Sequence, residues 1–203
     1  MSDGAEAARC VAFIGMKPPC PRSRNRLPVA GVSMIEVMIA VAVLGVLAAV
    51  ALPVFDGARE ATRSGTAQQA LAASVLLAAS RAASGAQDVV VCPGVPHACG
   101  GGIDWHRGWI AYADADGDRV HDAGESLLQQ VGPLGGKVRL RSTIGRTRLV
   151  FQPDGSSAGT NTTFTLCDGR GTGHATALVL NNAGRLRAAA PDAGAARACV
   201  DAQ

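Results

Sequence analysis

The pattern of apolar and polar residues changes twice along the chain. Residues 37–55 form a run of 19 positions without a charged side chain. A helix of that length, at about 1.5 Å per residue, nearly spans a hydrocarbon core about 30 Å thick. The following residues have the pattern of an amphipathic helix, with apolar residues at positions i, i+4, i+7 and i+11: Leu71, Val75, Ala78 and Ala82. We expect this helix to end near Ser84, because Gly85 is a typical helix-terminating residue.

Beyond residue 86 the pattern favours short strands. Eight runs, partly β-branched and separated by Gly, Asp or Asn turns, cover residues 89–92, 108–113, 127–131, 138–141, 148–152, 162–167, 175–181 and 185–188. They predict an antiparallel sheet that covers the apolar stripe of the helix. A long helix followed by strands is an α+β arrangement. The predicted organisation is a leader at 1–31, a membrane helix at 32–55, an amphipathic continuation at 56–85 and a β-sheet domain at 86–203.

Charge changes the interpretation of the N-terminal region. The formal net charge is +3, but residues 1–31 hold five of the 19 Lys and Arg residues and two of the 16 Asp and Glu residues. A chain that begins at Val32 therefore carries 14 of each and is neutral. The basic residues Arg22, Arg24 and Arg26 precede the apolar run, which places that end of the helix in the cytoplasm by the positive-inside rule. An ordinary transmembrane anchor fits these facts. A Sec-type signal does not, because no small-x-small cleavage site follows the apolar run.

One carboxylate, Glu36, stands at the edge of the apolar run. An unpaired ionisable group inside a membrane helix costs about 2.5–3.5 kcal/mol, so we expect Glu36 to have a partner. The segment Ala30-Gly31-Val32-Ser33-Met34-Ile35-Glu36 resembles the class III signal cut by prepilin peptidase, although Val32 departs from the usual Phe or Met. The resemblance implies cleavage after Gly31, N-methylation of Val32, and a Glu36 that pairs with the N-terminus of a neighbouring subunit and sets the assembly register.

Two further features of this region follow from the same resemblance. Pro53 falls 22 residues into the processed chain, where pilins commonly carry a proline that kinks or locally melts the helix. The other interpretation of Pro53 is the simple end of the anchor. The 31-residue leader is long for a prepilin, and a start at Met16 would give a short, basic leader.

A series of motifs in the strand region narrows the resemblance. Trp105-x-x-Gly108-Trp109, Phe151-x-Pro153-Asp154-Gly155, Thr163-Phe164-x-Leu166-Cys167 and Gly184-Arg185-Leu186-Arg187 resemble the GspH/FimT family, over about residues 31–199. Its members are minor pseudopilins of type II secretion and minor pilins of type IV pili. The resemblance implies an inner-membrane protein with a periplasmic domain, and as partners prepilin peptidase, other pilin subunits and the inner-membrane assembly platform. We expect no enzyme, because no motif brings a nucleophile and a base together.

Six cysteines are present, and four of them lie in the strand region. Four cysteines allow three pairings. We favour Cys92–Cys99 and Cys167–Cys199, because each pair closes a local loop or ties down a terminal segment. Free, buried thiols are the alternative, which an exported domain disfavours.

An acidic loop follows the second predicted strand. Five carboxylates occupy relative positions 1, 3, 5, 9 and 12, the oxygen-ligand spacing of an EF-hand: Asp114, Asp116, Asp118, Asp122 and Glu125. This spacing suggests Ca²⁺. Against it, Arg119 occupies position 6, where an EF-hand has glycine, and strands rather than helices flank the loop. The alternative is a polar hairpin turn.

Basic residues form two candidate sites for DNA. Lys137, Arg139 and Arg141 alternate and would project from one face of a strand. Arg185 and Arg187 match a Gly-Arg-x-Arg motif that FimT-like minor pilins use to capture DNA during natural transformation. Arginine contacts to phosphates would give salt-sensitive, sequence-independent binding. The alternative is a solvated sheet edge whose charges prevent edge-to-edge pairing.

Overall fold

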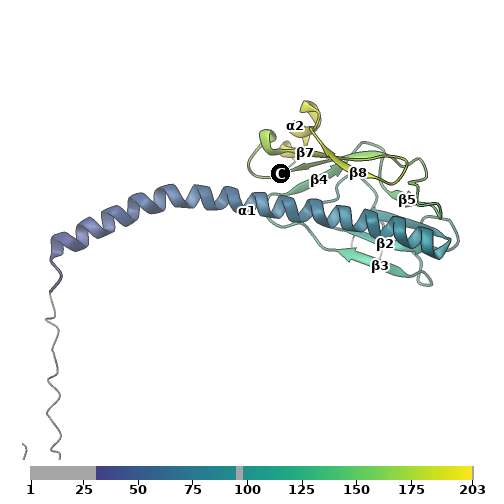
Figure 1. Cartoon of the computed structure of the whole chain (residues 1–203), viewed down its shortest axis with the longest axis horizontal. Helices are drawn as coiled ribbons and strands as arrows, with labels where there is room; N and C mark the ends of the chain where they lie inside the picture. Colours follow the sequence, from purple (N-terminus) through teal and green to yellow (C-terminus); the bar gives the residue numbers. More distant parts are fainter. Residues whose placement is uncertain (1–30, 95–97, 203) are drawn as a thin grey trace, which may run out of the picture. The chain divides into compact units, whose positions relative to one another are not determined.

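The computed structural model describes residues 31–94 and 98–202, and the chain divides into two units, residues 1–44 and 45–203. One long helix, α1 (Met34–Gly85), begins where the backbone N–H groups of Glu36 and Val37 donate to the Ser33 carbonyl, and it ends at the predicted glycine. In the described part of the chain, eight strands, one short 3-10 helix (Thr172–His174) and a second α-helix follow it (Figure 1). The predictions about the leader concern its basic residues, such as Arg22, and the alternative start at Met16. These residues lie outside the described part of the chain.

The two predicted halves of α1 differ sharply in burial. Every described side chain from residue 31 to 56 is exposed, whereas Leu71, Ala78 and Ala82 are fully buried. Among the described residues, α1 is the one helix whose length and apolar composition suffice to cross a membrane. The helix continues through Pro53, so the structure contains no local melting there. A kink at Pro53 stays a prediction.

All eight predicted strands are present, with ends within one residue of the prediction, but they form two sheets and the predicted single sheet is wrong. Sheet I has the order β3-β2-β1-β5 and contains β1 (Asp88–Pro93), β2 (Trp109–Asp114), β3 (Leu127–Val131) and β5 (Leu149–Phe151). Sheet II has the order β4-β6-β7-β8 and contains β4 (Arg139–Ser142), β6 (Thr162–Cys167), β7 (Thr176–Leu180) and β8 (Leu186–Ala189). Every described pairing is antiparallel. Alternation in the sequence specifies which face of a strand is apolar but not which strand is its neighbour.

The buried half of α1 packs against both sheets in one core (Figure 1). Sheet I contributes Val89, Trp109 and Phe151, and sheet II contributes Leu140, Phe164, Leu166 and Leu178. The Trp109 Nε1–H donates to Ser74 Oγ of α1 at 2.8 Å, and both residues are fully buried. The predicted role of the apolar stripe is thus confirmed, with two sheets covering it in place of one.

A short C-terminal helix, α2 (Ala193–Asp201), was not predicted. Asp192 caps its N-terminus, because its Oδ1 accepts the N–H groups of Gly194 at 2.8 Å and Ala195 at 3.2 Å. Nine residues are too few for a stable isolated helix. Contacts with sheet II and a disulfide therefore have to hold α2 in place.

Candidate functional site

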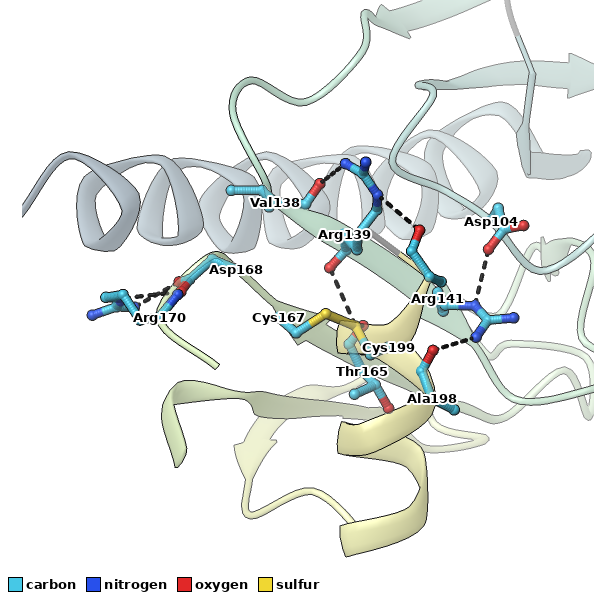
Figure 2. The surroundings of a disulfide bond; sticks show 11 residues. Asp104, Val138, Arg139, Arg141, Thr165, Cys167, Asp168, Arg170, Ala198 and Cys199 are labelled. Carbon is cyan, nitrogen blue, oxygen red and sulfur yellow. Dashed lines mark hydrogen bonds and ion pairs between the residues drawn. A yellow bond between two sulfur atoms is a disulfide. The ribbon is translucent and has the colours of Figure 1, made fainter. Parts of the chain in front are cut away.

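Two disulfides staple the domain, in the pairing favoured from the sequence. Cys92, in β1, bonds to Cys99 with a Cα–Cα distance of 5.5 Å, and Cys167, in β6, bonds to Cys199 of α2 with a Cα–Cα distance of 6.1 Å. The second bond attaches α2 to the face of sheet II that points away from α1 (Figure 2).

Two of the candidate DNA-binding arginines hold the same helix. Arg141 donates from Nε to Asp104 Oδ1 and from Nη1 to the Ala198 carbonyl, each at 2.9 Å (Figure 2). Arg139 donates to the Ala202 carbonyl at 3.4 Å and to the Val138 carbonyl at 3.1 Å. The last carbonyls of a helix have no partner within the helix, so these guanidinium groups cap the C-terminal end of α2. Both guanidinium groups therefore help to hold α2 against sheet II. Lys137 precedes β4 and is exposed.

Of the other two arginines, Arg187 lies on β8, at the opposite edge of sheet II, and Arg185 immediately precedes this strand. Arg185 and Arg187 are exposed, and their side chains make no hydrogen bond or ion pair with any residue that the structure describes. The register places Arg187 beside Val179 on the same face as Arg141. Three strand spacings, about 14 Å, separate the β4 and β8 edges. The two basic sets therefore do not form one cluster.

The acidic loop folds around its own carboxylates. Asp114, Asp116 and Asp118 place one oxygen each within 4.8 Å of one another. Asp114 is buried, and burial raises its pKa above the ordinary value although the backbone N–H groups of Gly117 and Arg119 bond to it. Arg119 has φ 64°, the left-handed conformation that glycine supplies at position 6 of an EF-hand.

Of the remaining two predicted calcium ligands, Glu125 uses its carboxylate to hold the loop backbone. Glu125 accepts the N–H groups of Ala115 at 2.9 Å and of Asp122 at 3.1 Å. The group of described carboxylates close enough to share an ion contains the first three aspartates only. The structure thus brings three of the five predicted ligands together and not the full set, and Ca²⁺ binding stays a prediction.

The residues of the predicted cleavage site lie just before α1. Gly31 and Val32 precede α1, and Glu36 lies in its first turn with an exposed side chain. A carboxylate there is favourable for the helix dipole. Within unit 1, the Glu36 carboxylate makes no hydrogen bond or ion pair with a described residue, which leaves it available to a second chain.

A cluster of cations near the end of the apolar run was missed from the sequence. Arg59 and Arg63 of α1 lie in one pocket with Lys137 and Arg170, which come from loops far along the chain. Arg170 pairs with the fully buried Asp168. No sequence signal links these residues, because only the packing of two loops on α1 brings them together.

Comparison with known proteins identifies the family. The model of "Type II transport protein GspH" matches residues 67–184, more than half of the chain. The chain belongs to the GspH family. The matched residues extend from the buried half of α1 to the β7–β8 turn and so include both sheets except β8.

A solved structure supports the fold. The type IV minor pilin FimU of Pseudomonas aeruginosa is 16% identical with a TM-score of 0.50, and the match covers 68% of this chain and 92% of FimU. A second crystal form of FimU is 21% identical with a TM-score of 0.48 and covers 64% of this chain and 94% of FimU. None of the curated proteins matches the chain. This chain thus has the α+β fold of a minor pilin or pseudopilin. Members of the GspH family are structural subunits.

Proposed function

We propose that this chain is processed and assembled as a minor subunit of a type II secretion pseudopilus or a type IV pilus. Prepilin peptidase would cleave it after Gly31 and the new N-terminus at Val32 would be methylated. Residues 32–55 would anchor the subunit in the bacterial inner membrane and then form the core of the fibre, with the sheet domain in the periplasm. The observation that carries this proposal is one exposed apolar helix, with Glu36 in its first turn, joined to a GspH-family domain.

Glu36 supplies the register in this proposal. In the hydrocarbon core, a carboxylate without a partner costs about 2.5–3.5 kcal/mol. The positively charged N-terminus of the adjacent subunit removes this cost in one axial position, because a shift by one helical turn separates the charges by about 5.4 Å. The apolar side chains around Glu36 can pack against a neighbouring helix in any axial register. The ion pair forms in one register and so selects it.

The test replaces the charge and retains the shape. We expect Glu36→Gln to insert into the membrane and to be cleaved normally, but to enter fibres far less than the parent. Asp201→Asn is the matched control, since it removes one exposed carboxylate from the domain and should assemble normally. N-terminal sequencing checks the cleavage. A mature chain that does not begin at Val32, or Glu36→Gln fibres at parental yield, would refute the proposal.

DNA binding during uptake is the second candidate function, and one observation favours it. Arg185 and Arg187 are exposed at a sheet edge without a described side-chain partner, so they can contact phosphates. Because Arg139 and Arg141 bond to α2, the candidate DNA residues without a described side-chain partner are Lys137, Arg185 and Arg187. Protein–protein assembly is therefore our first proposal and DNA capture the alternative.

A gel-shift series in salt distinguishes the two functions. With residues 57–203, Arg185→Ala/Arg187→Ala should weaken DNA binding and reduce the slope of log affinity against log salt by about 2. Arg81→Ala/Arg107→Ala removes the same charge from exposed positions outside β8 and should leave both quantities unchanged. Equal losses in the two double variants would mean that general charge, and not the β8 motif, attracts DNA.

A further inference from the structure

A polar pocket of about 480 Å³ lies at the part of α1 that follows the apolar run. Four cations line it: Arg59, Arg63, Lys137 and Arg170. The two carboxylates on its wall are Asp56 and Glu60. The cations come from three segments, namely α1, the loop before β4 and the loop after β6, so the pocket exists only in the folded domain.

Internal bonds fix two of the four cations. Arg170 donates from Nε to Asp168 Oδ1 at 3.0 Å and from Nη2 to Oδ2 at 2.7 Å. Burial alone would raise the pKa of Asp168, but the hydrogen bonds from Arg170 outweigh it, and the pKa lies below the ordinary value. Arg63 Nη1 pairs with Glu60 Oε1 at 2.7 Å. Each carboxylate uses at most two of the five N–H donors of a guanidinium, so further donors remain for a ligand.

Two glycines make room for close contacts in this pocket: Gly136 lies against α1, and Gly169 lies against Lys137. Gly136 has φ 65°, and a Cβ added there would clash with Arg63 Nη1. A Cβ on Gly169 would lie 2.9 Å from Lys137 Cδ. The Lys137 N–H also donates to Glu60 Oε2 at 3.3 Å. The backbone thus brings Lys137 to the level of Glu60 along the helix.

The remaining two cations are uncompensated. Arg59 and Lys137 are exposed, and their side chains make no hydrogen bond or ion pair within the described part of the chain. Glu60 and Asp168 are already paired, so Asp56 is the one pocket carboxylate that opposes them. The open part of the pocket is therefore positive and suits an anion.

The depth of the pocket identifies the anion, given the membrane anchoring proposed above. At about 1.5 Å per residue, Arg59 lies about 6 Å and Arg63 about 12 Å beyond Phe55. The headgroup layer extends roughly 5–8 Å beyond the hydrocarbon core on each side. We infer that this pocket binds the phosphate of an anionic phospholipid in the periplasmic leaflet and holds the domain on the membrane surface before assembly.

The order of folding is compatible with this site. The segment that follows the anchor in sequence, residues 56–63, holds two acidic and two basic residues and is neutral during translocation. Lys137 and Arg170 join it only after the domain has folded on the far side. The cations therefore do not oppose the orientation that the positive-inside rule gives to the helix. Entry into a fibre would break the lipid contact.

The test uses the full processed chain in nanodiscs of phosphatidylcholine, with or without phosphatidylglycerol. Amide exchange is measured for residues 56–63, 134–138 and 168–171. Each cation near an anionic surface favours binding about fivefold, so we expect several-fold slower exchange of these segments in anionic discs, and loss of the difference in high salt. Arg59→Gln/Lys137→Gln should remove the difference. The matched control Arg187→Gln/Arg197→Gln changes the same charge on exposed residues outside the pocket and should retain it.

Each contrary result has a distinct meaning. Equal exchange in neutral and anionic discs would overturn the lipid site and leave the anchoring intact. Failure of the chain to insert into neutral discs would overturn the anchoring and the lipid site with it. Protection by inorganic phosphate in neutral discs would mean a soluble anion in place of a lipid. Parental lipid protection combined with lost fibre assembly in the double variant would assign these cations to a neighbouring subunit.

Discussion

Arg141 offers a direct test of whether an arginine serves the fold or a ligand. Replacing it by Gln removes the guanidinium that joins β4 to Asp104 and to the C-terminal end of α2. The Arg141 and Asp104 side chains are 26% and 47% exposed. A pair this exposed contributes about 0.2–1 kcal/mol. The bond to the Ala198 carbonyl adds about 1 kcal/mol, and the position at a helix C-terminus adds a few tenths.

The free energy of unfolding should therefore fall by about 1–2 kcal/mol, which for a domain of this size lowers Tm by about 2–8 °C. Trp105 and Trp109 are both buried and report unfolding through their fluorescence. Arg187→Gln is the control, because its side chain has no bond within the described residues and should leave Tm unchanged. If β8 binds DNA, Arg187→Gln should weaken DNA binding and Arg141→Gln should leave it unchanged. An unchanged Tm for Arg141→Gln, together with unchanged amide exchange in α2, would refute the structural role.

Three further changes give separable results. Ser74→Ala leaves the Trp109 Nε1–H without its acceptor and should lower the free energy of unfolding by about 1–3 kcal/mol relative to Ser80→Ala on the exposed face of the helix, measured in urea. The three-aspartate site predicts that Ca²⁺ raises Tm of the parent and not of Asp116→Ala, and no shift in the parent ends the calcium hypothesis. Because the pKa of Asp168 is depressed in the folded state, its ionised form stabilises the domain at neutral pH and this contribution is lost below about pH 4. Parent and Asp168→Asn should therefore differ most at neutral pH and converge in acid, and a constant difference would contradict the assignment.

Much of the fold could be predicted because it follows from local chemistry. The boundary between the exposed and buried halves of α1 follows from the change from uniformly apolar to amphipathic residues, and α1 ends at the expected glycine. The eight strands follow from alternation and turn residues. The disulfide pairing followed from loop lengths, since each bond joins residues that are close in the chain or fixes a terminal segment.

The errors concern interactions between distant residues. β4 and β5 are consecutive, yet they belong to different sheets, because pairing depends on how both sheets pack on α1. The helix α2 is too short to predict from its own residues and depends on Cys167 and two arginines. For the same reason, Arg139 resembled a free strand charge in the sequence and caps a helix in the structure. The lipid pocket has no sequence signature, since Lys137 and Arg170 reach α1 only through tertiary packing.

The order in which the strands alternate between the two sheets has a consequence for folding. Sheet I requires β5, which follows the first strand of sheet II, so neither sheet corresponds to a continuous segment of the chain. An intermediate with one complete sheet would have to close a loop that contains part of the other, which costs chain entropy before the contacts with α1 repay it. The two sheets should thus form and unfold in a single cooperative step. An exchange of one sheet between relatives would cut the chain several times and is expected to disrupt both.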